Sequence, residues 1–250
     1  MVEQRRGALR TAVVWDAVAA LLAEQSELRV VDLGGGTGGL AVRVAALGHR
    51  VTVVDPSPDA LAALQRRADD DGVAERVHGV QGDAADLHDH VEPGGADLVL
   101  CHGVLEVVDE PDQALASIHQ ALRPGGSLSV VVAGRLASVV ARALAGHFDQ
   151  ATELLHDIPA AGGRPAGTGD GRRREPRRYT REEILDLLDR HALRAGEVHA
   201  VRVFTDLVPS ALLDAEPGAA SALLALERAV SERPEFVALA AQLHVVARRD

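Results

Sequence analysis

Apolar and polar positions alternate along the first half of the chain in the manner of repeated strand–helix units. Amphipathic stretches of helical length, such as residues 40–47 and 112–121, separate short apolar runs, and a helix over residues 7–24 precedes them all. Strands that alternate with helices form parallel sheets whose faces the helices cover. The pattern therefore predicts an α/β fold with a mostly parallel sheet, whose first five strands are residues 28–33, 50–54, 77–81, 97–101 and 127–133.

The second half of the chain has a less regular pattern. Residues 134–147 predict a helix, and residues 160–178 are so rich in glycine, proline and arginine that we expect a mobile loop. A helix starts again after Tyr179, where Thr180 and Glu183 have the spacing of a capping box. The last elements are predicted to be a strand at 198–204, a helical pair at 209–239 and a strand at 242–247. We predict one domain over residues 1–250, in which residues 134–178 form an insertion and residues 205–241 a helical cover.

A glycine cluster follows the first predicted strand and precedes a helix, in the sequence Asp32-Leu33-Gly34-Gly35-Gly36-Thr37-Gly38. Glycines let the backbone turn sharply and let a ligand lie close to the main chain. The helix behind them directs its free N–H groups toward that ligand. Gly34, Gly36 and Gly39 also match the G-x-G-x-x-G pattern of dinucleotide-binding proteins. The loop by itself predicts a nucleotide-like cofactor and leaves its identity open.

Acidic residues follow the next two predicted strands. Asp55 ends the second strand, where a carboxylate can accept hydrogen bonds from both ribose hydroxyls. Asp83 follows the third strand, where a side chain or a backbone N–H can meet an adenine edge. Each also has a purely structural interpretation: Asp32 as a cap of the glycine loop, Asp55 as a turn former before Pro56, and Asp83 as a loop residue in competition with Asp86.

Residues 122–126 (LRPGG) precede the fifth predicted strand and form a turn that is typical of methyltransferases. Together with the glycine loop, Asp55 and Asp83, this turn resembles the class I S-adenosylmethionine-dependent methyltransferases over residues 10–133. The resemblance implies a Rossmann-like fold, in which helices flank a mostly parallel seven-stranded sheet whose last strand is antiparallel. It also implies S-adenosylmethionine as the cofactor. An NAD-binding module is the alternative that the degenerate glycine motif supports.

A closer resemblance extends over nearly the whole chain. Residues 101–108 (CHGVLEVV), followed by Glu110 and Pro111, resemble the H-x-V-L-E-x-V…P segment of the bacterial tRNA 5-carboxymethoxyuridine methyltransferases. Residues 7–10 (GALR), 145–149 (AGHFD) and 201–204 (VRVF) are also similar to segments of that family. One departure is Val107, where the family often has tryptophan.

That family methylates the carboxylate of a modified wobble uridine in the tRNA anticodon and forms a methyl ester. Carried over to this chain, the resemblance implies that Arg10 contacts the cofactor carboxylate, Asp55 its ribose, and His102 its methionine portion. Ala84 and Ala85 would lie at the adenine. The full set of cofactor-binding residues that we predict is Arg10, Asp32, Gly34, Gly35, Gly36, Gly38, Asp55, Pro56, Asp83, Ala84, Ala85 and His102.

The acceptor decides what chemistry the protein must supply. A carboxylate, with an ordinary pKa near ~4, is already ionised at neutral pH, so methyl transfer to it needs no general base. Because an arginine binds a carboxylate with its planar fork, Arg202 is our candidate for holding the acceptor, and Tyr179 our candidate for stacking a base. Arg202 could equally be an ordinary strand arginine, and Tyr179 could simply start a helix. His102 either shapes the cofactor pocket or, for an O–H or N–H substrate, accepts a proton.

Charge and aromatic content bear on the acceptor in opposite ways. The net charge of −11 argues against a general nucleic-acid binder, and five aromatic residues are few for stacking unpaired bases. Locally, however, residues 160–178 carry six arginines against two acidic residues. We expect a tRNA anticodon loop to dock there, on Arg172, Arg173, Arg174, Arg177 and Arg178. The alternative acceptor is a small molecule, as for the O- and N-methyltransferases of secondary metabolism.

The remaining composition narrows the class of protein. A single cysteine, Cys101, excludes an internal disulfide and a cysteine-based metal cluster, and it suits a reducing, cytoplasmic environment. No apolar run approaches the ~20 residues that cross a bilayer. His88 and His90 stand two apart without a third ligand in the pattern, so we predict no metal site. A non-catalytic cofactor-binding protein is a further alternative that no motif favours.

Overall fold

The computed structural model describes residues 2–156 and 176–250, except for the side chains of residues 2–6, 8, 210, 214 and 215. Most of the predicted arginine-rich loop, including Arg172, Arg173 and Arg174, therefore lies outside the described residues. None of the helices in the described part is long and apolar enough to span a membrane.

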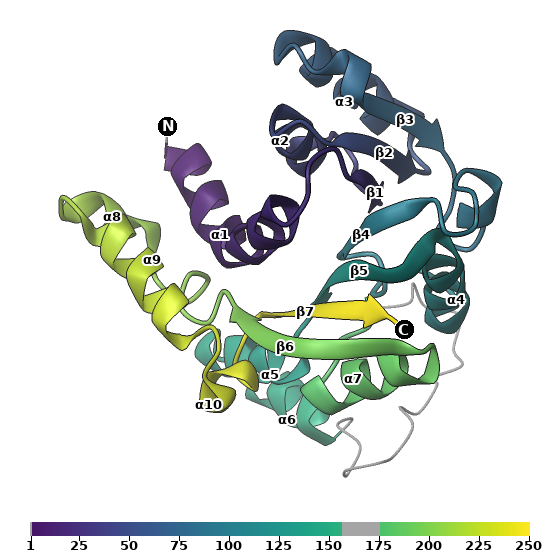
Figure 1. Ribbon diagram of the computed structural model, residues 1–250. Helices are drawn as coiled ribbons and strands as arrows, with labels where there is room; N and C mark the ends of the chain where they lie inside the picture. The colour runs from purple at the N-terminus through teal and green to yellow at the C-terminus, as the bar shows by residue number, and fades with distance from the viewer. Residues whose placement is uncertain (1, 157–175) are drawn as a thin grey trace. The chain divides into compact units, whose positions relative to one another are not determined.

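A seven-stranded sheet runs through the chain in the order β3-β2-β1-β4-β5-β7-β6 (Figure 1). Its first five strands pair in parallel and its last strands are antiparallel, which confirms the predicted α/β fold. The strands are β1 (Arg29–Leu33), β2 (Arg50–Asp55), β3 (Val77–Gln81), β4 (Ala96–His102), β5 (Leu122–Ala133), β6 (Leu193–Val201) and β7 (Gln242–Arg249).

Helices connect the parallel strands and continue beyond them. α2 packs against β2, and α3 packs against β3. The α-helices are α1 (Val2–Ala23), α2 (Gly39–Ala46), α3 (Pro58–Asp70), α4 (Pro111–Ala121), α5 (Arg135–Leu144), α6 (Phe148–His156), α7 (Arg181–Arg190), α8 (Ser210–Ala215), α9 (Ala219–Val230) and α10 (Pro234–Val237); short 3-10 turns lie at Ala74–Arg76 and Leu87–Asp89.

Residue contacts divide the chain into two compact units, each assembled from separate stretches of sequence. The sheet unit consists of Trp15–Val132, Ile184–Glu197 and His244–Asp250, and the helical unit consists of Met1–Val14, Ala133–Glu183 and Val198–Leu243. The sheet unit contains the parallel strands and α2 to α4, and the helical unit contains α5, α6 and α8 to α10. The predicted single domain with an insertion and a helical cover stays a prediction.

The core of the sheet unit follows from strands with apolar residues on both faces. Val53, Leu98, Leu100, Leu128 and Val130 are at most 1% exposed. Such continuous apolar runs are typical of parallel strands that are covered on both faces. Each fully buried leucine or valine contributes roughly 1.5–3 kcal/mol relative to exposure, so these strands fix the sheet on which the loops at its edge are built.

Local signals place the helix ends where the sequence predicts them. Ser57 caps α3 by accepting a hydrogen bond from the backbone N–H of Ala60 at 3.2 Å, and Pro58 follows as the first helical residue. The backbone N–H of Thr180 donates to Glu183 at 2.8 Å, and the backbone N–H of Glu183 donates to the Thr180 hydroxyl at 3.3 Å. The predicted capping box is therefore confirmed.

Two predicted boundaries were wrong. The stretch expected to be a turn at 122–126 belongs to β5, because Leu122 pairs with Ala96 and the ladder then shifts register between Ala96 and Leu98. The strand expected at 198–204 is β6, which ends at Val201. There Arg202 turns the backbone into the left-handed region, with φ of 60°.

Candidate functional site

The glycine loop leaves β1 as a ledge built almost entirely of main chain. Gly34, Gly36 and Gly38 have φ values of 67°, 54° and 75°, the left-handed region that glycine tolerates. A Cβ on Gly35 would lie 2.5 Å from the Asp32 carboxylate and 2.9 Å from the Val53 side chain. The loop therefore leaves no room for a side chain at Gly35, and the backbone of Gly34, Gly36 and Gly38 disfavours one.

Asp55 ties the end of β2 to this loop. Its Oδ2 accepts a hydrogen bond from the backbone N–H of Gly36 at 2.9 Å, and its Oδ1 accepts one from Ser57 N–H at 2.9 Å. The side chain is 7% exposed. Since each carboxylate oxygen can accept a second hydrogen bond, Asp55 keeps acceptor capacity at the loop.

Asp32 lies beneath the same loop in a different electrostatic state. It is 3% exposed, and its Oδ2 has no hydrogen-bond partner among the described residues. Burial, assisted by the nearby Asp55 charge, raises the pKa of Asp32 to about 7. A buried carboxylate oxygen of this kind calls for a partner, and a cation at the loop would supply one.

A cleft of about 570 Å³ opens beside the loop, which is a typical size for a small-molecule site. Its loop after β3 is held by two hydrogen bonds: Ala85 N–H donates to Asp83 at 3.2 Å, and the Ser117 hydroxyl of α4 donates to the Ala85 carbonyl at 2.8 Å. The cleft is lined by Leu33, Gly34, Val54, Asp55, Pro56, Gly82, Asp83, Ala84, Ala85, His102, Gly103, Val104, Val107, Val108, Asp109, Glu110, Gln113 and Ala114.

The lining combines apolar and acidic groups. Val107, 68% exposed, lies in an apolar part of the wall with Val104 and Val108. Four acidic residues also line the cleft and no arginine does, within the part of the chain that the structure describes. Such a lining favours a ligand that carries positive charge.

His102, at the end of β4, forms part of the cleft wall. Its Nε2 lies 2.8 Å from the Ser129 hydroxyl. Burial lowers the pKa of His102 to about 4, so the ring is neutral at pH 7. Its neighbour Cys101 is fully buried, and burial holds the pKa of its thiol far above the usual range. Cys101 is therefore an unreactive strand residue, as the sequence predicts.

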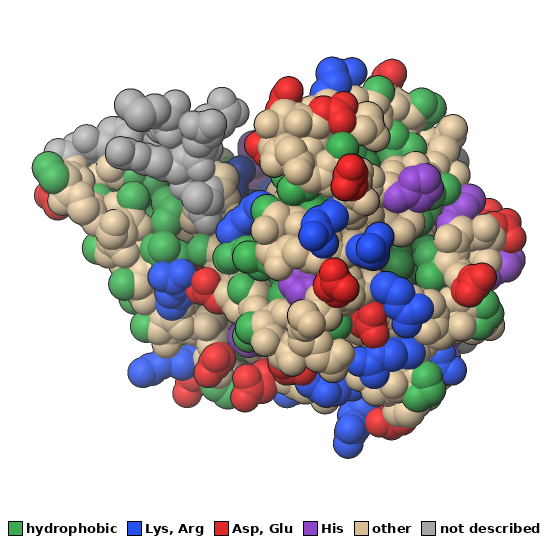
Figure 2. All heavy atoms as spheres, turned by 45° about the horizontal axis from the view of Figure 1, so that its top comes forward, with side chains coloured by type: hydrophobic (Ala, Val, Ile, Leu, Met, Phe, Trp, Pro, Cys, Tyr) green, Lys and Arg blue, Asp and Glu red, His purple; other side chains and the backbone are tan. Residues whose placement is uncertain are grey.

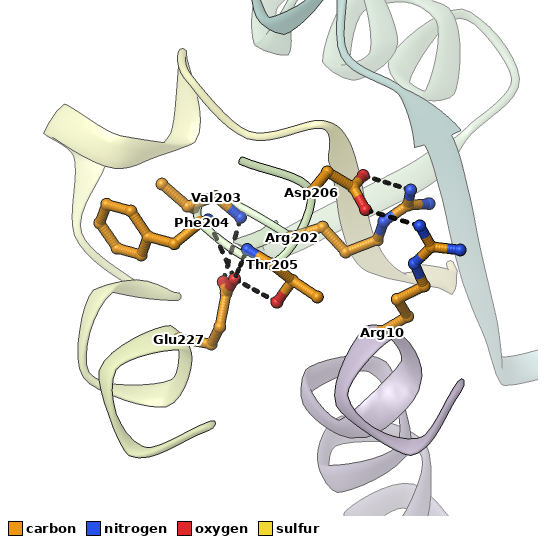
Figure 3. Close-up of polar contacts among 7 residues, drawn as sticks. All are labelled: Arg10, Arg202, Val203, Phe204, Thr205, Asp206 and Glu227. Carbon is orange, nitrogen blue, oxygen red and sulfur yellow. Dashed lines mark hydrogen bonds and ion pairs between the residues drawn. The ribbon is translucent and has the colours of Figure 1, made fainter. Parts of the chain in front are cut away.

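The helical unit contains a separate polar cluster, centred on the turn after β6. Asp206 accepts from Arg10 at 3.1 Å and also pairs with Arg202, so that two guanidinium groups share one carboxylate (Figure 3). In the same turn, Glu227 of α9 accepts from the backbone N–H groups of residues 203, 204 and 205 at 3.0, 3.0 and 2.7 Å, and from the Thr205 hydroxyl at 2.6 Å. Glu227 is 1% exposed and holds the turn that carries Arg202 and Asp206.

Comparison with known proteins shows which proteins this chain is similar to. Residues 31–128 match a family model described as a methyltransferase domain. The chain is 35% identical over 146 residues to the tRNA 5-carboxymethoxyuridine methyltransferase of Escherichia coli K12, an alignment that covers 58% of this chain and 56% of that protein. Residues 31–128 are therefore similar to a methyltransferase domain.

Two further comparisons bear on the fold and on the breadth of the likeness. A ubiquinone biosynthesis O-methyltransferase of Xanthomonas euvesicatoria pv. vesicatoria is 32% identical over 49% of this chain and 50% of its own length. A solved S-adenosylmethionine-dependent methyltransferase from Mesorhizobium loti superposes with a TM-score of 0.59 at 22% identity, covering 96% of this chain and all of that one. The chain spans about half the length of the curated relatives it matches. The likeness to the solved structure confirms the predicted class I methyltransferase fold.

The fold brings most of the predicted cofactor residues to one cleft. The lining includes Gly34, Asp55, Pro56, Asp83, Ala84, Ala85 and His102. Gly35, Gly36 and Gly38 belong to the loop itself, where Gly38 faces Leu64 so closely that a Cβ would lie 2.0 Å from it. Asp32 lies in β1, just before the loop. Contacts with the cofactor stay predictions.

The remaining predicted residues lie in the helical unit. Arg10 and Arg202 pair with Asp206, and Tyr179 is 8% exposed, which leaves little of its ring accessible to a base. Tyr179 joins the unit through its backbone, which bonds to Ala133 and Arg135. Of the predicted tRNA contacts, Arg177 and Arg178 are described, and the Arg178 carbonyl accepts from Arg135 at 2.8 Å. On the face that Figure 2 shows, arginines stand beside acidic side chains over much of the surface.

Sequence reasoning did not find Asp206 and Glu227. A signal for Glu227 was present, because this acid occupies the apolar stripe of α9, four residues after Leu223 and three before Val230. All three side chains are buried. An acidic residue on an apolar helix face needs hydrogen-bond donors, and the pattern alone does not name them.

Proposed function

We propose that this protein transfers the methyl group of S-adenosylmethionine to the carboxylate of 5-carboxymethoxyuridine at the tRNA wobble position, forming a methyl ester. The observation that carries the proposal is the cleft at the ends of β1 to β4, where the glycine loop, Asp55 and His102 meet. The choice of acceptor is supported by the 35% identity to the Escherichia coli enzyme and by the resembling segments at residues 101–108 and 201–204.

The cleft residues fit the cofactor by their chemistry. Asp55 has free acceptor capacity for ribose hydroxyls, and the loop of Ala84 and Ala85 suits the adenine. The buried, unpartnered Oδ2 of Asp32 fits a cofactor with a positive charge near the glycine loop, and so does the acidic lining. When bound, S-adenosylmethionine supplies an electrophilic methyl group on a sulfonium.

The reaction on a carboxylate is a displacement in which a C–O bond forms as the C–S bond breaks. The acceptor is already ionised at neutral pH, so no proton has to be removed. The protein's residues would align the two groups and exclude water, an effect worth up to ~7–11 kcal/mol. The apolar wall of Val104, Val107 and Val108 suits that exclusion.

The acceptor's negative charge needs a cation that the cleft lining lacks. An arginine fork is the expected group, and we propose Arg202 for this role. Arg172, Arg173, Arg174, Arg177 and Arg178 would bind tRNA phosphates, so we expect activity to fall steeply as salt rises. Arg202→Ala should raise the KM for the acceptor and leave the affinity for S-adenosylhomocysteine unchanged.

A small-molecule acceptor is the second candidate. The likeness to the ubiquinone biosynthesis O-methyltransferase and the acidic cleft favour it. A neutral hydroxyl acceptor, however, would need a base to take its proton, whereas a carboxylate would not.

Mass spectrometry of tRNA nucleosides distinguishes the two. tRNA that carries unmethylated 5-carboxymethoxyuridine is incubated at low salt with the protein and deuterium-labelled S-adenosylmethionine, then digested. We expect the labelled methyl ester in the wobble nucleoside and none on phenolic small molecules. If the protein binds S-adenosylhomocysteine and leaves the tRNA unlabelled, the tRNA assignment is wrong.

A further inference from the structure

Behind the cleft wall, three polar side chains on neighbouring strands form a hydrogen-bonded chain. His102 ends β4, Ser129 lies in β5, and His244 lies in β7, all within the sheet unit. The Ser129 hydroxyl is 2.8 Å from His102 Nε2 and 2.9 Å from His244 Nε2. The two rings stand edge to face, with centroids 6.1 Å apart and planes at 85°. Ser129 and His244 are completely buried.

The donors and acceptors in this chain are constrained. A hydroxyl donates one hydrogen bond, and a neutral imidazole has one N–H and one bare nitrogen. If Ser129 donates to one Nε2, the other Nε2 must carry its own proton and donate to the hydroxyl oxygen. Were both rings to donate, the hydroxyl proton would be left without an acceptor among the described residues, which is costly at a buried site. The two histidines must therefore be opposite tautomers.

Protonation of His102 would disturb this arrangement. Where His102 is the ring that accepts, an imidazolium with its two N–H donors could no longer accept from Ser129 at Nε2. Burial acts in the same direction, because it lowers the pKa of His102 to about 4. The ring that faces the cleft is therefore a fixed neutral dipole and a poor partner for a proton that an acceptor must lose.

We propose that Ser129 and His244 are positioning residues that hold His102 in the cleft wall as the neutral tautomer with its proton on Nδ1, so that its Nε2 accepts from Ser129, its ring orients the methyl donor and it takes no proton from the acceptor. This inference rests on the proposed methyl transfer. It restricts the methyl acceptor to groups that are already deprotonated when they bind, such as a carboxylate, because His102 is held by its hydrogen bond with Ser129. Ser129 and His244 act through His102 and do not themselves line the cleft.

Nitrogen-15 NMR of the histidine rings tests the arrangement directly. The protein contains 11 histidines, and the spectra of His102→Gln and His244→Gln assign the two that matter. At pH 7 we expect both rings to be neutral, with the proton of His102 on Nδ1 and that of His244 on Nε2. A His102 with its proton on Nε2, two rings with the same tautomer, or a His102 imidazolium at pH 7 would overturn the proposal. This measurement needs no acceptor, so it decides the inference even if the tRNA assay is negative.

Kinetics with a matched pair of variants tests the positioning role. Ser129→Ala removes the central hydroxyl, and Ser127→Ala removes a hydroxyl from the same strand that forms no hydrogen bond with either histidine. In Ser129→Ala we expect His102 to populate both tautomers and kcat to fall about tenfold, equivalent to ~1.4 kcal/mol of barrier. Ser127→Ala should change neither. A single His102 tautomer in Ser129→Ala, or equal losses of kcat in the two variants, contradicts the proposal.

Discussion

The sheet unit and the helical unit solve the problem of buried charge in different ways. In the sheet unit, Asp32 is buried with an unpartnered oxygen and has a pKa raised to about 7. In the helical unit, Glu227 is buried equally well but accepts four hydrogen bonds. The difference indicates that the glycine loop leaves capacity for a ligand, whereas the turn after β6 is complete without one.

The strands of the sheet unit and the short helices of the helical unit also differ in how far their apolar side chains are exposed. Strand β4 in the middle of the sheet has no exposed residue, whereas the short helices α5, α6 and α8 of the helical unit leave Leu144, Phe148, Leu155 and Leu212 between 53% and 70% exposed. The matched family model ends at residue 128, within β5 of the sheet unit. The part that matches the family model therefore lies in the sheet unit.

Removing the Glu227 carboxylate should have the largest effect. Glu227→Ala leaves backbone N–H groups of the 203–205 turn without acceptors, and we expect a loss of about 3–5 kcal/mol in the free energy of unfolding, measured by urea denaturation. Glu232→Ala, which changes an exposed acid just beyond the same helix, should cost less than ~0.5 kcal/mol. Equal stability of the two variants would mean that the turn does not depend on its carboxylate.

The second largest effect is expected for Asp55→Ala, which should weaken the binding of the cofactor. Loss of the carboxylate frees the Gly36 N–H and removes the predicted ribose acceptor, so the affinity for S-adenosylhomocysteine should fall by about 1–3 kcal/mol in isothermal titration calorimetry. The control is Asp59→Ala, which removes an exposed carboxylate four residues further along the chain. Unchanged affinity in Asp55→Ala would show that the cofactor does not use this strand end.

Asp32 should have a smaller effect, on how the free energy of unfolding depends on pH. Its folded-state pKa, about 7, lies above the ordinary value of 3.8, so the folded state binds the proton more tightly. The stability that this group contributes is complete below pH 4 and is lost as the pH rises through 7. Between pH 5 and pH 7 we expect the free energy of unfolding, measured by urea denaturation, to fall by about 2 kcal/mol more in the ligand-free protein than in the Asp32→Asn variant. If the free energy of unfolding depends on pH in the same way in both proteins, Asp32 is not a buried acid with a raised pKa.

Much of the cofactor side could be predicted from the sequence because it depends on local patterns. Asp55 meets the glycine loop because the carboxyl ends of adjacent parallel strands share one edge of the sheet, and β1 and β2 are adjacent. The caps at Ser57 and Thr180 involve residues three apart. In each case the interaction is encoded within a single element or between consecutive strands.

The other contacts could not be predicted because they join residues that are remote in the chain. Ser129 and His244 are 115 residues apart and meet only because β7 inserts beside β5. Arg10 and Asp206 are 196 residues apart. Hydrophobic periodicity predicts that a strand exists and which side chains share its face, but it carries no information on which distant strand lies beside it.

The amino-acid sequence by itself determined the α/β class, the glycine loop and the acidic strand ends, since backbone sterics and apolar periodicity act over a few residues. Only the tertiary structure decided that Asp32 has a raised pKa and that Glu227 holds the turn that carries Arg202. It also decided that His102 is hydrogen-bonded through Ser129 to His244. Those properties arise from desolvation and from hydrogen bonds between distant segments, and both exist only once the chain has packed.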